Sequence, residues 1–203
     1  MSDETTPVIA AAYRTPQGKE DGAFADLRSE DLSVPLIDEI LAETGLSGED
    51  IDDLMWGCAQ QRDEQGNNLA RVIALLSELG ESVPATTINR WCASSMQAVI
   101  SASDAVRAGQ RDAVIAGGVE SMSRVKMGEN THNVHPRLND LYNVGELQMG
   151  MTAEKVADEY EVSREAQDEY ALRSHQRAAA ATEEGRFDDQ IVPIETEDGV
   201  VDE

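Results

Sequence analysis

Cys92 is the side chain in this sequence best suited to covalent chemistry. It lies in the stretch "ATTINRWCASSMQAVISASDAVRAGQ", where an apolar, β-branched run over residues 85–91 stops and a helical pattern over residues 94–110 begins. The first N–H groups of a helix are unpaired and carry the positive end of its dipole, so they stabilise a nearby thiolate. The small residues 93–95 leave room for a thioester and for N–H groups around an oxyanion. A nucleophile fits this position, and a buried packing role is the common alternative for a cysteine.

The other residues that could do acid–base or metal chemistry show no useful spacing. Cys58 lies within a strand-like run and is interpreted as structural. His132, His135 and His175 are interpreted as loop and helix-surface residues, because their spacing suggests neither a ligand set nor a general base. No cysteine–histidine cluster has metal-ligand spacing, and "AGGVES" has too few glycines for a dinucleotide-binding loop. We therefore expect no metal and no redox cofactor.

Strand-like and helix-like patterns alternate along the first part of the chain. The strands are expected at residues 7–15, 53–58, 85–91 and 112–121, and the helices at residues 29–45, 67–80 and 94–110. The last of these strands has the near-continuous apolar composition of a fully buried strand. This alternation is typical of βαβ units, so it predicts an α/β fold with a mixed, mainly parallel sheet and helices on its faces.

The pattern changes after Ser123. A long polar connection leads to two helices, at residues 152–161 and 163–185, with Ser163 as an N-cap. The chain closes on a hairpin with Asp198 and Gly199 at its turn. We therefore expect an α/β domain over residues 1–123 and a mostly helical loop or lid domain over residues 124–203. This second domain is expected to be incomplete at its C-terminal end, because the chain stops inside a strand.

Charge is the most unusual bulk property of the chain. The sequence has 40 acidic and 16 basic residues, a formal net charge of −24, and only Lys19, Lys126 and Lys155 are lysines. Such a surface repels nucleic acids and anionic membranes, so neither is expected as a partner. A salt-rich cytoplasm that screens self-repulsion explains the acidity, and an acidic protein of ordinary habitat is the alternative. With no signal-peptide pattern, no apolar run near the roughly 18 residues of a membrane span and no disulfide framework, the chain is expected to be soluble and cytoplasmic.

Several long segments resemble the thiolase family. The most specific is "INRWCASSMQAVISASDAVRAGQRDAVIAGGVESMSRV", which resembles the active-site segment of thiolases nearly position for position. Further similarity lies in "RTPQGKEDGAF", "DDLMWGCAQQRDEQGNNLAR", "MGMTAEKVADEYEVSREAQDEYALRSHQRAAAA" and "GRFDDQIVPI". The resemblance covers essentially all 203 residues and is greatest to the degradative 3-ketoacyl-CoA thiolases.

The resemblance implies a layered thiolase-like fold and a role for two residues. Cys92 would attack a 3-ketoacyl-CoA, release acetyl-CoA and pass its acyl group to a second CoA, or run the Claisen condensation in reverse. Its backbone N–H would serve an oxyanion hole, and Met149 would line the pantetheine tunnel. Gln148 stands where short-chain biosynthetic members commonly carry a histidine. The substrates would be acyl-CoA and CoA with no cofactor, and the complete enzyme would be a homodimer or homotetramer.

The resemblance also implies that catalytic groups are missing. Thiolases are about twice this length, and their second half supplies a Gly-His-Pro and a Cys-x-Gly-Gly-Gly segment, neither of which occurs here. We therefore expect the chain to be the N-terminal portion of an acyltransferase, weak or inactive alone, with apolar helix faces left uncovered. One alternative is a non-catalytic remnant or split subunit that needs a separately encoded C-terminal half. Another is a cysteine hydrolase that pairs Cys92 with a local histidine such as His135.

Overall fold

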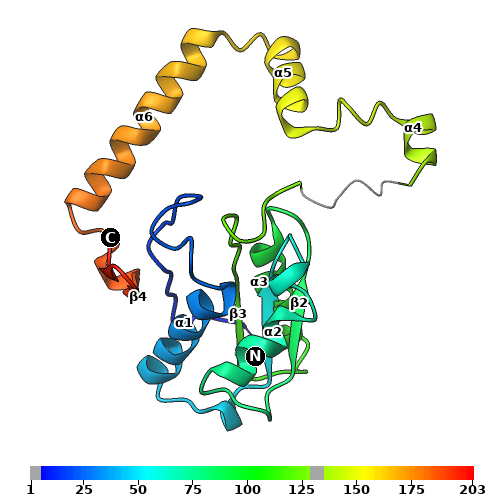
Figure 1. Cartoon of the computed structure of the whole chain (residues 1–203). Helices are drawn as coiled ribbons and strands as arrows, with labels where there is room; N and C mark the ends of the chain where they lie inside the picture. Colours follow the sequence, from blue (N-terminus) through cyan, green and yellow to red (C-terminus); the bar gives the residue numbers. More distant parts are fainter. Residues whose placement is uncertain (1–5, 129–134) are drawn as a thin grey trace. The chain divides into compact units, whose positions relative to one another are not determined.

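The computed structural model describes residues 6–128 and 135–203. The chain divides into two compact units, one formed by residues 1–127 with 190–203 and the other by residues 128–189 (Figure 1). Residues 190–203 were expected in the second domain, but they group with the first unit.

A three-stranded parallel sheet organises the first unit. Its strands are β1 (Asp53–Gly57), β2 (Ala85–Ile88) and β3 (Val114–Gly118), in the order β2-β1-β3. In the register, Leu54 of β1 pairs with Ala85 on one side and with Ile115 on the other. The parallel sheet confirms the expected α/β class, but the expectation that the strand at 112–121 is fully buried is wrong. Only Ile115 of β3 is buried, because β3 is an edge strand.

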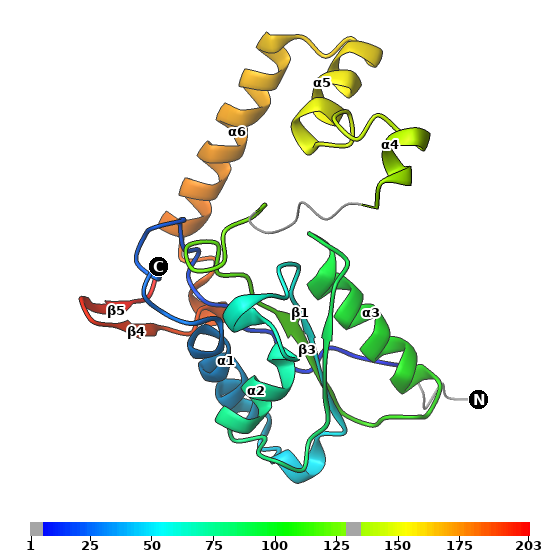
Figure 2. The ribbon, with the colours of Figure 1, turned by 45° about the vertical axis from the view of Figure 1, so that its right-hand side comes forward.

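Helices cover both faces of this sheet. The helices α1 (Ser29–Thr44) and α2 (Leu69–Leu76) lie on one face and α3 (Ser94–Arg107) on the other (Figure 2). Short 3-10 turns lie at Gly48–Asp50, Asp63–Gln65 and Asp188–Gln190. The helix α1 ends as expected at Gly45, whose φ of +68° is left-handed and whose N–H donates to the Leu41 carbonyl at 2.9 Å.

The hydrophobic core lies between the sheet and the pair α1 and α2. Its fully buried members include Ile37 of α1, Leu54 of β1, and Leu69 and Ile73 of α2. In contrast, α3 buries only small residues against the sheet: Ser94, Ala98 and Ala102.

The strand expected at residues 7–15 does not form, so this prediction is wrong. Only Arg14 makes a bridge: its N–H donates to the Gln190 carbonyl and its carbonyl accepts from the Val192 N–H, both at 2.9 Å. Val8 and Ile9 are 83% and 79% exposed. Apolar, β-branched residues favour a strand only where a neighbouring strand supplies a backbone ladder, and none of the three strand pairings between described residues includes residues 7–13.

A short antiparallel hairpin completes the first unit. It consists of β4 (Ile194–Thr196) and β5 (Gly199–Val201). The pairing of Thr196 with Gly199 puts Glu197 and Asp198 in the turn, one residue before the expected position. Ile194 is buried against Phe24 and Leu32, which explains why the hairpin groups with the first unit.

The second unit contains α4 (Arg137–Leu141), α5 (Met149–Glu159) and α6 (Arg164–Glu183). Ser163 caps α6 as expected, with its hydroxyl accepting from the Ala166 N–H at 3.2 Å. None of the three helices contains a buried residue. Across the described part of the whole chain, no helix combines the length and the apolar character that crossing a membrane requires.

Candidate active site

Cys92 lies on the turn that joins β2 to α3. It is a free, exposed cysteine, and α3 begins at Ser94 with Ala93 as its N-cap. The cysteine therefore precedes the cap instead of lying in the first helical turn. Trp91 has a φ of +50°, in the left-handed region that a residue with a bulky side chain rarely adopts. This conformation turns the chain sharply and places Cys92 at the amino end of α3.

Hydrogen bonds within the turn hold it closed. The Ser94 hydroxyl accepts from the Arg90 N–H at 2.9 Å and donates to the Trp91 carbonyl at 2.5 Å. The N–H groups of Ala93 and Ser94 donate to the carbonyls of Arg90 and Trp91 at 3.1 and 3.0 Å. Between described residues, the N–H of Cys92 has no acceptor, so it is free to donate to the oxygen of a bound ligand.

Two glycines allow the start of α3 to lie directly on the sheet. A Cβ added to Gly57, at the end of β1, would overlap the backbone of Ser94 and Ser95. A Cβ added to Gly118, at the end of β3, would overlap the Ser95 hydroxyl and the Gly57 carbonyl. The amino end of α3, and with it Cys92, is therefore fixed against the carboxyl ends of two parallel strands, where ligand sites of open α/β sheets lie.

A polar cluster beside these strand ends, in which an exposed Glu120 binds buried partners, was not expected from the sequence. The carboxylate of Glu120 accepts from the N–H groups of Ala59 and Gln60 at 2.8 and 3.0 Å, and from the Gln65 amide at 2.8 Å. Gln65 is completely buried, and its amide oxygen accepts from Ser29 at 2.7 Å and from the Ser121 N–H at 2.8 Å. The cluster joins the segments after β1 and β3 to the start of α1. The one feature of the sequence that could have indicated this cluster is the acidic Glu120, which closely follows the strand-like "DAVIAGG".

Cys58 is also a free cysteine, but it is buried, whereas Cys92 is exposed. Cys58 is 1% exposed, and its thiol lies 3.6 Å from a carboxylate oxygen of Glu120. Burial, followed by the negative charge of Glu120, raises the pKa of Cys58 to about 12. Its thiol stays protonated near neutral pH, which suits the structural role expected for it.

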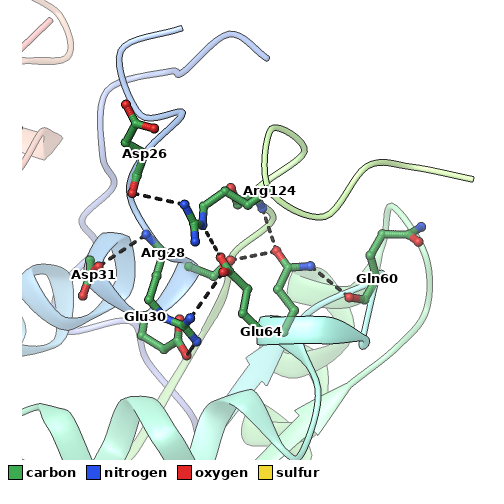
Figure 3. A network of polar contacts seen from close by, with 10 residues as sticks. Asp26, Arg28, Glu30, Asp31, Gln60, Glu64 and Arg124 are labelled. Carbon is green, nitrogen blue, oxygen red and sulfur yellow. Dashed lines mark hydrogen bonds and ion pairs between the residues drawn. The ribbon is translucent and has the colours of Figure 1, made fainter. Parts of the chain in front are cut away.

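Ion pairs link the same segments at the surface (Figure 3). Arg28 pairs with Glu30 at 2.8 Å and with Glu64 at 3.3 Å, and Arg124 pairs with Glu64 at 2.7 Å. The hydrogen bond to Glu30 is the main cause that raises the pKa of Arg28, and the hydrogen bond to Glu64 is the main cause that raises the pKa of Arg124. The side chains of Arg28 and Arg124 are 47% and 33% exposed, whereas those of Glu30 and Glu64 are only 4% and 12% exposed. These partly buried pairs join residues 28–30, 64 and 124 beside the polar cluster.

The outer face of α3 is apolar and uncovered. Met96 is 68% exposed, and Val99 and Ile100 are 42% and 45% exposed. This agrees with the expectation of uncovered apolar helix faces. The nearby Trp91 side chain is 63% exposed as well.

The histidines do not accompany Cys92 in the first unit. All three belong to residues 128–189, and His132 lies outside the described residues. His135 is exposed with its Nδ1 accepting from the Arg137 N–H at 3.2 Å, and His175 is exposed on α6. Among the described residues, no group of three or more His, Cys, Asp or Glu side chains could hold a metal ion.

Met149 lies in an apolar groove of the second unit. It is the first residue of α5, with Gln148 as the N-cap. The groove has a volume of about 560 Å³ and is also lined by Leu147, Val156 and Val162.

Comparison with known proteins identifies the family. Residues 7–202 match the family described as "Thiolase, N-terminal domain". The chain belongs to the thiolase family. This confirms the family inferred from the segments around Cys92.

Two thiolases and one solved structure illustrate the relationship. The chain is 45% identical over 188 residues to the 3-ketoacyl-CoA thiolase of Pectobacterium carotovorum and 46% identical over 188 residues to that of Serratia proteamaculans. Each match covers 92% of this chain and 48% of the relative. The crystal structure of the Bacillus anthracis acetyl-CoA acetyltransferase matches with a TM-score of 0.81 and 36% identity, over 96% of this chain and 52% of that one. The chain thus has the thiolase fold and spans about half the length of these thiolases.

Proposed function

We propose that this chain supplies the nucleophilic half of a thiolase that cleaves 3-ketoacyl-CoA reversibly to acyl-CoA and acetyl-CoA. The observation that carries the proposal is the exposed Cys92 at the amino end of α3, within a chain that matches the thiolase N-terminal domain. The relatives named 3-ketoacyl-CoA thiolase support the choice of substrate class.

In the proposed reaction, the Cys92 thiolate attacks the 3-keto carbonyl carbon of the substrate. The bond between C2 and C3 then breaks, its electron pair leaves on the acetyl-CoA enolate, and an acid protonates that enolate. The acyl group remains on Cys92 as a thioester until the thiolate of a second CoA attacks it and releases acyl-CoA. The N–H of Cys92, which has no acceptor among the described residues, donates to the oxyanion formed in both attacks.

The second unit is proposed to contact coenzyme A. The apolar groove that includes Met149 is suited to the pantetheine arm, which has few charged groups. The substrates are CoA thioesters, and the chemistry described above needs no further cofactor. Gln148 stands where short-chain members of the family carry a histidine, so we propose no strict preference for acetoacetyl-CoA.

Thiolysis needs an acid and a base beside the nucleophile. The first unit, which holds Cys92, contains no histidine that could serve in either role. We therefore propose that catalysis needs a C-terminal half, present on a longer chain or encoded separately. The uncovered apolar face of α3, with Met96 and Ile100, supports such a partner. The complete enzyme is proposed to be a homodimer or homotetramer in the cytoplasm.

Co-expression with a C-terminal half tests this proposal. The chain is produced with and without the second half of the Serratia proteamaculans thiolase, and thiolysis of acetoacetyl-CoA and of longer 3-ketoacyl-CoA is measured by loss of the substrate's absorbance. We expect turnover only in the two-part preparation, and none when the chain carries Cys92→Ser. Equal turnover by the chain alone, or turnover that survives Cys92→Ser, would contradict the proposal.

A further inference from the structure

A continuous path of hydrogen bonds crosses the sheet and ends at the Cys92 turn. One residue at the end of each strand takes part: Glu120 after β3, Ala59 after β1 and Asn89 after β2. Because the strands are parallel and in the order β2-β1-β3, their carboxyl ends meet at one edge of the sheet. All residues of the path lie in the first unit.

Each step of the path has good geometry. Glu120 accepts from the Ala59 N–H at 2.8 Å. The Ala59 carbonyl accepts from the Asn89 side-chain amide at 2.9 Å. The amide oxygen of Asn89 then accepts from the Trp91 N–H, also at 2.9 Å. The Asn89 side chain therefore connects the loop after β1 to the residue immediately before Cys92, with its donor and its acceptor both in use.

The path ends at the least favourable backbone conformation of the turn. Trp91 holds a φ of +50°, which costs conformational energy for any residue other than glycine. Its side chain is 63% exposed, so packing does not fix this conformation. What holds it are the hydrogen bonds of its N–H to Asn89 and of its carbonyl to Ser94.

Glu120 provides the fixed end of the path. Its carboxylate also accepts from the Gln60 N–H and from the fully buried Gln65, so it cannot move without breaking several bonds. Hydrogen bonds to a carboxylate are stronger than those between neutral groups.

We infer that Asn89, anchored through Ala59 by Glu120, is a positioning residue that holds Trp91 in its left-handed conformation and thereby sets the reactivity of Cys92. The inference rests on the proposed role of Cys92 as the nucleophile. Asn89 itself need not touch the substrate, because it acts through the backbone of the turn.

Asn68 offers a matched control. Its side chain, like that of Asn89, bonds at both ends: its amide donates to the Ala85 carbonyl at 3.0 Å, and its oxygen accepts from the Thr87 hydroxyl at 2.8 Å. These bonds reach β2 but not the Cys92 turn. Asn68→Ala therefore removes an asparagine side chain with one donated and one accepted bond in the same unit without touching the path.

The test compares the wild-type chain with Asn89→Ala, Asn89→Asp and Asn68→Ala. Exchange of the Trp91 amide hydrogen reports the turn, and the rate of Cys92 alkylation by iodoacetamide between pH 6 and pH 10 reports its reactivity. Loss of one hydrogen bond corresponds to about a fivefold change. We expect Asn89→Ala to speed Trp91 exchange and to slow Cys92 alkylation near neutral pH, each about fivefold. Asn89→Asp keeps the acceptor for Trp91 but loses the donor to Ala59, so it should restore Trp91 protection in part.

Amide exchange in β1 and α2 shows whether each variant remains folded, so a local change can be told from unfolding. The inference is overturned if Asn89→Ala leaves both readouts unchanged, or if Asn68→Ala changes them as much. Failure of the proposed function would appear separately, as absent thiolysis in the two-part preparation, because both readouts here use the chain by itself. Glu120→Gln keeps the shape of the side chain but leaves it one accepting oxygen. It should therefore speed Trp91 exchange and slow Cys92 alkylation, each by a smaller factor than Asn89→Ala does.

Discussion

The two faces of the parallel sheet differ in what covers them. On one face, α1 and α2 bury large apolar side chains such as Ile37, Leu54 and Ile73, and Cys58 belongs to that core. On the other face, α3 buries only small residues against the sheet and leaves Met96, Val99 and Ile100 exposed. The exposed Cys92 lies at the amino end of this second helix.

This difference separates the main source of stability from the proposed site of chemistry. The face of α1 and α2 has the dense apolar packing that stabilises a domain by itself. On the face of α3, the backbone approaches two glycines closely and the turn before the helix is hydrogen-bonded, which fixes the position of Cys92 but buries little apolar area. The two cysteines follow the same division, because Cys58 is buried in the core and Cys92 is exposed.

The largest predicted effect contrasts two truncations, one on each face. Leu54→Ala should lower the free energy of unfolding by about 2–5 kcal/mol, because the side chain is fully buried and leaves a cavity. Ile100→Ala should change it by less than about 0.5 kcal/mol, because that side chain is 45% exposed in this chain. Urea titrations measure both. Similar losses for the two variants would show that the α3 face is packed as tightly as the core.

A glycine substitution tests the close approach of α3 to the sheet. Gly57→Ala places a methyl group onto the backbone of Ser94 and Ser95, so it should cost about 1–3 kcal/mol and slow alkylation of Cys92. Gly150→Ala, inside α5, meets no atom within 4 Å and serves as the matched control, with no loss expected. If Gly57→Ala were as harmless as Gly150→Ala in the same urea titration, the account of how Cys92 is positioned would be wrong.

The pH dependence of stability sharpens the contrast between the cysteines. The pKa of Cys58 is raised from its ordinary 9.0 to about 12, so the folded chain keeps a proton that the unfolded chain loses. The stabilisation is therefore fully present below pH 9 and is lost as the pH rises toward 12. Between pH 9 and pH 10, the wild type should lose about 1 kcal/mol more than Cys58→Ala does. Parallel curves for the two proteins over this range would contradict the raised pKa.

A further prediction concerns salt, whose effect should be small beside that of a core truncation. With a formal net charge of −24, the chain repels itself, and raising KCl from about 0.1 to 1 M shortens the Debye length from about 10 to 3 Å. We expect the melting temperature to rise by about 2–4 °C, equivalent to about 1 kcal/mol. Calorimetry at both salt concentrations tests the proposed adaptation to a salt-rich cytoplasm. A melting temperature that is unchanged or lower in KCl would remove its support.

The local patterns in the sequence predicted the parts of the site that depend on neighbouring residues. The start of α3 at Ser94 and the cap at Gly45 depend on residues close together in the chain, and both agree with expectation. The strand β2 starts at Ala85 as expected but ends at Ile88, three residues before the expected end at residue 91. The cluster of Glu120 and Gln65 was not predicted, because its partners lie 55 residues apart and meet only after the sheet forms. The expected strand at 7–15 failed for a related reason: composition favours a strand, but a strand also needs a partner.

The most direct test of the central claim is to locate the acyl group on the chain itself. The folded chain is incubated with acetyl-CoA, and its peptides are mapped by mass spectrometry, with Cys92→Ser and Cys58→Ser as controls. The account predicts an acetyl thioester on Cys92 that forms slowly in the chain alone and faster once a C-terminal half is added, while Cys58 stays unmodified. Acetylation of Cys58, or of Cys92 no faster in the folded chain than in urea, would contradict the claim that this fold presents Cys92 as the nucleophile.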